Sequence, residues 1–155
     1  MRTALGVLLV SFALIASSCT PLTLRPADFS WPVEEVQAPD GNGTVTIKRY
    51  DFQFNAKPLL FEELKDSVHV THHALRVIRD QDGYYFMTAK DFKNVYVFTQ
   101  GEGSLKLEKK IEVSEKGLDA PAMNQRPPFI QLVNADNAKA APVLLSRSGV
   151  EEGGK

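Results

Sequence analysis

Three histidines stand close together in His69-Val70-Thr71-His72-His73, and imidazole is a common side chain for metal binding and acid–base catalysis. In a helix, positions 69, 72 and 73 would share one face and could hold a metal ion. In a strand, His69 and His73 would lie about 13 Å apart, and His72 would point to the opposite face. Because zinc–nitrogen bonds are only about 2.0–2.1 Å long and β-branched neighbours favour a strand, the sequence predicts no metal site here.

Other catalytic arrangements have little support in the sequence. There is no Gly-x-Ser-x-Gly turn, and the only cysteine is Cys19. Adjacent carboxylates such as Glu34-Glu35 and Glu62-Glu63 point opposite ways in a strand, whereas the pair in a glycosidase faces one cleft at about 5–9.5 Å. The net charge of −1 does not indicate the basic face of a nucleic-acid-binding protein. We therefore expect a non-enzymatic protein with no catalytic residues and no cofactor.

The first 18 residues have the organisation of a secretory signal. Arg2 provides a positive charge, the apolar run 4–16 follows, and Ser17 and Ser18 end it. The run is shorter than the roughly 20 apolar residues that span a bilayer. Charge, apolar core and small residues in this order predict a signal peptide that is removed from the mature protein.

Cys19 stands immediately after this signal. The four residues Ala16-Ser17-Ser18-Cys19 resemble the lipobox of bacterial lipoproteins, although leucine is commoner than alanine at the first position. The resemblance implies cleavage before Cys19, a lipid on its sulfur and a membrane anchor in the cell envelope. In Gram-negative lipoproteins Asp at the next position commonly signals inner-membrane retention, so Thr20 implies the outer membrane in such an organism.

Residues 19–43 are predicted to be a proline-rich tether, because prolines at this density favour extended backbone. Phe29 and Trp31 are its apolar exceptions. They either pack onto the following domain or form a docking peptide for a partner. We predict a β-rich domain over residues 44–147 and a disordered, glycine-rich and acidic tail over 148–155.

The domain is predicted to be mainly β, because short apolar or alternating segments separated by turns run along it. In 44–54 the apolar phase switches near Lys48-Arg49, which predicts a bulge. In 105–113 the apolar residues fall on odd positions, which predicts a strand with one wet face. The other predicted strands are 67–79, 84–88, 94–99, 129–133 and 143–145.

Together these segments predict a small antiparallel meander that forms a sandwich or a partly open barrel, with at most one short helix after the signal peptide. That helix is expected near Pro58. Many aromatic residues fall in the predicted strands. They either pack in the core, form an exposed patch for a partner, or line a cavity for an apolar ligand.

The segment Gln125-Arg126-Pro127-Pro128-Phe129 is predicted to be extended, because Pro-Pro favours that conformation. Arg126 and Phe129 are therefore candidate partner-binding residues, together with Phe29 and Trp31. The alternative is a loop that crosses one end of the sheet.

Three functions remain open at this point. The first is a membrane-anchored, non-enzymatic accessory or binding module of the cell envelope, with another envelope protein as its partner. The second is a β domain that binds a lipid or another small apolar ligand in a cavity lined by aromatic residues. The third is a hydrolase that uses His69, His72 or His73.

Overall fold

The structure of the protein is a computed structural model that describes residues 32–134 and 141–151. Cys19, Phe29 and Trp31 lie outside the described residues, as do the predicted signal peptide and most of the tether. Within the described ranges, no helix is long and apolar enough to span a bilayer.

A five-stranded antiparallel sheet forms the middle of the molecule, with the strand order β1-β4-β5-β6-β7. Its strands are β1 (Glu35–Gln37), β4 (Leu75–Arg79), β5 (Tyr85–Ala89), β6 (Asn94–Gly101) and β7 (Ser104–Glu112). Side chains alternate between its two faces, so Phe86 belongs to one buried cluster while Tyr85 and Met87 belong to the other. Both faces of this sheet are therefore covered.

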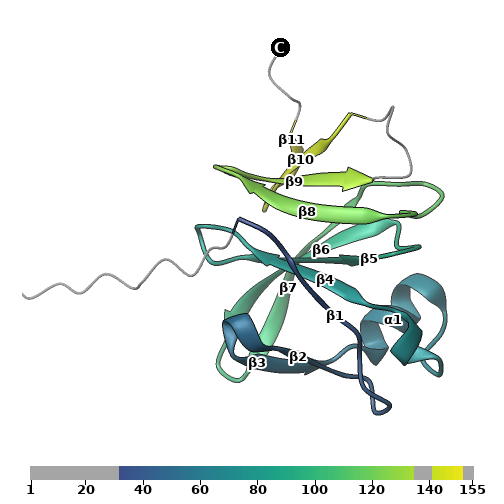
Figure 1. The fold of residues 1–155 in the computed structure, drawn as a ribbon. Helices are drawn as coiled ribbons and strands as arrows, with labels where there is room; N and C mark the ends of the chain where they lie inside the picture. Colours follow the sequence, from purple (N-terminus) through teal and green to yellow (C-terminus); the bar gives the residue numbers. More distant parts are fainter. Residues whose placement is uncertain (1–31, 135–140, 152–155) are drawn as a thin grey trace, which may run out of the picture.

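A four-stranded antiparallel sheet covers the first face (Figure 1). Its strands, in the order β11-β10-β9-β8, are β8 (Pro121–Arg126), β9 (Phe129–Asn134), β10 (Val143–Ser146) and β11 (Gly149–Glu151). The core between the two sheets contains the apolar side chains Ile78, Phe86, Val95, Val97, Ile111, Leu118, Met123, Ile130, Leu132 and Leu145. This packing makes a small β sandwich.

A hairpin and a helix cover the opposite face of the central sheet (Figure 1). The hairpin consists of β2 (Thr44–Ile47) and β3 (Phe52–Asn55), and α1 (Lys57–Leu64) follows it directly. The second core lies beneath them and includes Val45, Ile47, Leu60, Leu75, Val77, Met87 and Phe92. The predicted fold class is confirmed: the described chain is mainly β and antiparallel, with one short α-helix and no closed barrel.

The switch of apolar phase near Lys48-Arg49 has a different cause from the predicted bulge. The chain turns there through a 3-10 helix (Lys48–Tyr50) and Asp51, whose φ is +53°. Val45 then pairs with Phe54, and Ile47 with Phe52, so 44–54 is a hairpin and not one strand. The chain reverses direction between β2 and β3, so the apolar positions of the two strands need not keep one alternation along the sequence. A bulge would shift the alternation in the same way.

The predicted single wet face of β7 is wrong, because this strand contains the bulge. Val97 pairs with Lys109 but Phe98 pairs with Leu107, which leaves Glu108 as the extra residue. Leu105 and Leu107 therefore face the hairpin side of the sheet, whereas Ile111 joins the core on the opposite side. The apolar residues of this one strand divide between two faces.

Regular structure also reaches into both segments that the sequence assigned to the tether and the tail. Glu35–Gln37 pair with Val77–Leu75, and Gly149–Glu151 pair with β10. The neighbouring Glu34 carboxylate binds the Arg76 guanidinium and accepts a 2.8 Å hydrogen bond from the backbone N–H of Met123. Burial raises the pKa of Glu34 despite these partners. Such edge strands are held by backbone pairing and polar contacts, which leave no apolar periodicity in the sequence.

Gly117 is expected to be essential for the loop between β7 and β8. Its φ is +98°, and a Cβ there would lie 2.8 Å from the backbone oxygen of Asp91. Gly117→Ala should lower the free energy of unfolding by about 2 kcal/mol or more, through backbone strain and this clash. Chemical denaturation checks this value. Gly41→Ala is the control, because a Cβ there meets nothing within 4 Å; equal losses for both variants would contradict the prediction.

Candidate functional site

An apolar groove lies between β3 and β7, with α1 at one end. We call it the β3–β7 groove. Its volume is about 470 Å³, and its apolar lining comes from β3, α1, β5, β6 and β7. The side chains that matter most are Phe54, Leu59, Tyr96, Phe98, Leu105 and Leu107.

The order of the strands explains why the groove is open. The Glu35 carboxylate of β1 accepts hydrogen bonds from the backbone N–H groups of Lys48 (3.3 Å) and Arg49 (3.2 Å), just after β2. These bonds hold the hairpin beside β1, over one face of the central sheet, and β3 comes to lie toward β7. Among the described strands β3 pairs only with β2, and β7 only with β6. The groove is thus an opening between the hairpin and the central sheet, bounded by two strand edges.

Aromatic rings make up much of the groove wall; Phe54 and Phe98 are only partly covered, whereas Tyr96 is 3% exposed. Phe98 lies next to Tyr96, with ring centroids 6.4 Å apart, and Phe54 lies 6.0 Å from Phe52. Leu107 is 48% exposed although it is a large apolar residue in the middle of a strand. An exposed leucine beside half-buried aromatic rings forms a continuous apolar surface that water reaches.

Glu63 holds α1 against the central sheet at one end of the groove. Its side chain is only 2% exposed. It accepts hydrogen bonds from the Tyr96 hydroxyl (2.6 Å), the Asn94 amide (2.7 Å) and the Lys93 backbone N–H (2.8 Å). Burial and, second to it, the hydrogen bond to Glu63 raise the pKa of Tyr96 far above its usual range. A carboxylate with this many donors is suited to positioning an element, and it has little capacity left for a substrate.

Charge near Glu63 is balanced by a neighbouring ion pair. The Lys110 ammonium bonds Glu62 at 2.8 Å and lies 4.0 Å from Glu63. It also stands 5.5 Å from the centre of the Tyr96 ring. At the other end a smaller pocket adjoins the groove; it shares Gln53 and Ser104 with the groove and is also lined by Asp51 and Gln100. The groove therefore has an apolar middle and two polar ends.

The three histidines lie in a turn and not in the predicted strand. Val70–His72 form a 3-10 helix, and β4 begins only at Leu75. Backbone N–H groups of Val68 and His69 bond the Asp66 carboxylate and lower its pKa to about 2. This cap turns the chain away from extended structure, which the β-branched residues alone would favour. The prediction of a strand over 67–79 is wrong for its first half.

These histidines are mostly at the surface. His69 is 68% exposed, its Nδ1 lies 3.0 Å from Asp66, and its ring stacks on that of His72 at 6.1 Å. In the part of the chain that the structure describes, no group of three or more histidine, cysteine or acidic residues is placed to hold a metal ion.

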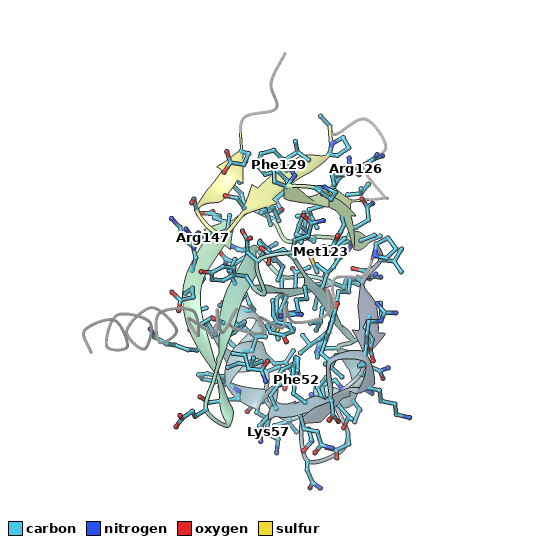
Figure 2. All side chains as sticks on the ribbon, turned by 90° about the vertical axis from the view of Figure 1, so that its left-hand side faces the viewer. Phe52, Lys57, Met123, Arg126, Phe129 and Arg147 are labelled. Atoms are coloured by element: carbon cyan, nitrogen blue, oxygen red, sulfur yellow. The ribbon has the colours of Figure 1, made fainter. Side chains whose placement is uncertain are left out.

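The two described candidates for partner binding, Arg126 and Phe129, face each other across a tight hairpin. They are paired residues of β8 and β9, joined by Pro127 and Pro128. The predicted extended stretch is therefore a two-residue turn, because the strands on either side pair as far as its ends. The guanidinium of Arg126 donates to the Gln131 side chain at 3.3 Å. Figure 2 shows both residues in the outer sheet, at the opposite end of the molecule from Phe52 and Lys57.

Sequence reasoning identified the aromatic residues of the groove but not the groove itself. A regular alternation places Leu105 and Leu107 on one face with Ile111, whereas the bulge at Glu108 puts these two leucines and Ile111 on opposite sides of the sheet. The signal was present: Lys109 interrupts an otherwise regular alternation, at the point where the register shifts.

No family model, curated protein or solved structure matches this chain. Evidence on function therefore comes from the Cys19 motif and from the geometry of the β3–β7 groove.

Proposed function

We propose that this protein is a lipid-anchored, non-enzymatic binding module of the bacterial cell envelope, and that it binds another envelope protein in the β3–β7 groove. The groove carries the proposal, because it combines a solvent-accessible apolar surface with the edges of two strands that no further described strand covers. Exposed apolar surface and open strand edges are both characteristic of interaction sites.

The lipid on Cys19 is part of the same proposal. It rests on the lipobox resemblance of Ala16-Ser17-Ser18-Cys19 and on the signal-like segment before it. Thr20 favours the outer membrane if the organism has one. An anchored domain searches for its partner in a thin layer beside the membrane, so a modest intrinsic affinity is enough.

The non-enzymatic part of the proposal is supported by how the polar groups near the groove are used. Glu63 is occupied by three donors, and Glu62 pairs with Lys110. The histidines belong to an exposed turn beside Asp66. A general base needs a free lone pair within reach of a bound substrate. The contacts of Glu62 and Glu63 already use their carboxylate oxygens, so neither is well suited to act as a general base in the groove.

A small apolar ligand is the second candidate occupant. The observation that favours it is the size of the groove: about 470 Å³ falls within the range of roughly 300–1,000 Å³ that is typical of small-molecule sites. Aromatic side chains are common in such sites as well. Both candidate occupants, a partner protein and a small apolar ligand, would bind in the same groove. They are distinguished by whether a protein or a small molecule is purified together with this protein.

Leu107→Asp should abolish partner binding while leaving the fold intact. The side chain is 48% exposed, so aspartate is tolerated in the free protein, but a charge would have to be buried when the groove is filled. We expect recovery of the partner from detergent-solubilised membranes to fall by about tenfold or more. A tenfold loss of affinity corresponds to about 1.4 kcal/mol of binding free energy.

The matched control is Val150→Asp, on β11 in the outer sheet, where the side chain is similarly exposed at 52%. It should leave recovery unchanged. Equal recovery with both variants would refute the groove as the binding site. If the wild type yields a small apolar molecule by native mass spectrometry and no protein, and Leu107→Asp loses that molecule, the second candidate is correct.

A further inference from the structure

The bulge gives the two faces of β7 different chemistry. Leu105 and Leu107 line the groove. Lys106 pairs with Thr99 and Lys109 with Val97, so both lysines share the side of the sheet on which Val97 lies. Without the extra residue Glu108, Lys106 and Lys109 would point to opposite faces. The open edge of β7 therefore has an apolar side facing the groove and a basic side facing away from it.

The basic side carries a net positive charge, because only one of its two lysines forms an ion pair with a described residue. Lys106 is 75% exposed, and its ammonium lies 3.6 Å from Glu108. Lys109 is exposed and takes part in no ion pair with the described residues. Lys110 points the other way, toward Glu62 on α1.

We propose that the occupant of the β3–β7 groove is an extended segment of the partner protein that adds to the edge of β7 as a further strand, with apolar residues alternating with acidic ones. This inference rests on the proposed function and specifies the chemistry of the partner. The apolar residues enter the groove beside Leu105 and Leu107. The acidic residues lie opposite Lys106 and Lys109, where opposite charges across neighbouring strands are favourable.

Backbone hydrogen bonds supply affinity in this mode of recognition, and alternate side chains supply specificity. The segment follows β7 over about six residues, roughly 20 Å. Because the bulge brings Lys106 and Lys109 opposite Thr99 and Val97, which are two residues apart, the matching acidic residues are also two apart. That spacing is the natural period of a strand.

A second copy of this chain fits the same edge poorly. Pairing of β7 with β7 of another copy would bring Lys106 and Lys109 close to the lysines of the other strand, and like charges across strands are destabilising. Lysines on an edge strand discourage association of identical edges. The same charges favour an acidic strand, which is why the inference commits to a different protein as the partner.

The test uses the full-length lipoprotein in detergent and fluorescent peptides of eight residues. One peptide alternates valine and glutamate, and the second has lysine in place of every glutamate. We expect the glutamate peptide to bind at least tenfold more tightly than the lysine peptide, with an advantage that shrinks as salt is raised. The double variant Lys106→Glu/Lys109→Glu should reverse this preference.

Two controls separate strand pairing from simple charge attraction. A glutamate peptide with alternate backbone amides methylated on one edge should lose binding, because it cannot donate to β7. Leu107→Ser, which adds no charge, should weaken binding of the unmethylated glutamate peptide, because it removes apolar surface from the groove. Equal affinity of the two unmethylated peptides, an unchanged preference in the double variant, or no binding of either peptide would overturn strand addition. The membrane recovery experiment with Leu107→Asp is independent of these peptides, so it shows whether the groove binds a partner in another way.

Discussion

Cys19→Ser is expected to abolish stable anchoring of the protein in the membrane. Each buried methylene contributes about 0.8 kcal/mol, and two or more acyl chains together give stable attachment. Serine lacks the sulfur that the lipobox resemblance assigns to the lipid. The variant should incorporate no labelled palmitate. It should appear in the soluble fraction, or remain as a precursor that retains residues 1–18.

Membrane fractionation and intact-mass measurement distinguish these outcomes. Ser18→Ala is the control, because it keeps a small residue before Cys19 and should be lipidated normally. A Cys19→Ser protein that is shortened by 18 residues and still sediments with the membrane would contradict lipid anchoring. In the soluble variant we expect the β domain to stay folded, since the strands and helix of the described fold begin only at Glu35.

Glu63→Ala should strongly destabilise the β domain. The substitution removes a nearly buried carboxylate and leaves the Tyr96 hydroxyl, the Asn94 amide and the Lys93 N–H without their acceptor. Hydrogen bonds to a charged group contribute about 1.5–3 kcal/mol each and are not additive. We expect a decrease of about 3 kcal/mol in the free energy of unfolding, the lower end of the range for breaking buried polar contacts.

Urea denaturation followed by circular dichroism measures this loss. Glu62→Ala is the matched control, because this neighbouring carboxylate is exposed and bonds only Lys110 among the described residues. It should have a much smaller effect. Tyr96→Phe should cost about 1 kcal/mol, the value of one typical hydrogen bond. If Glu62→Ala and Glu63→Ala were equally destabilising, Glu63 would not hold α1 on the sheet.

The segments with the clearest local signals could be predicted from the sequence. Asp82-Gly83 is a sequence that favours a tight hairpin turn, and the structure turns there between β4 and β5, with Gly83 at φ +92°. The run Val95-Tyr96-Val97 is apolar on both faces of its predicted strand, and all three residues are buried in β6. Pro58 indicated the start of a short helix, and it lies in the first turn of α1. In each case the determining interactions are between neighbours in the chain.

The features that shape the groove could not be predicted in the same way. The bulge at Glu108 depends on the register between β6 and β7, and a change of register leaves only a weak trace in one strand. The position of the hairpin depends on Glu35, which bonds backbone groups more than ten residues away. The position of α1 depends on Glu63 and a strand that lies thirty residues further along. Long-range polar contacts of this kind have no periodic signature.

The candidate partner-binding residues illustrate the same limit. Arg126 and Phe129 were chosen because Pro-Pro favours an extended chain, yet strand pairing on both sides turns that segment into a hairpin. The aromatic residues of the predicted strands were recognised as a possible cavity lining. Their arrangement around an open gap follows from the strand order, which the pattern of single strands does not contain.

Site-specific photo-crosslinking in intact cells tests the central claim most directly. A photoreactive amino acid would be placed at Leu107 in the groove and, in a second strain, at Val150 in the outer sheet; both side chains are about half exposed. The proposal predicts a discrete protein adduct from position 107 and none of the same mass from position 150. It also predicts that the adduct disappears when Leu105→Asp is added beside the probe. A discrete adduct from position 150 with none from position 107 would contradict the β3–β7 groove as the binding site.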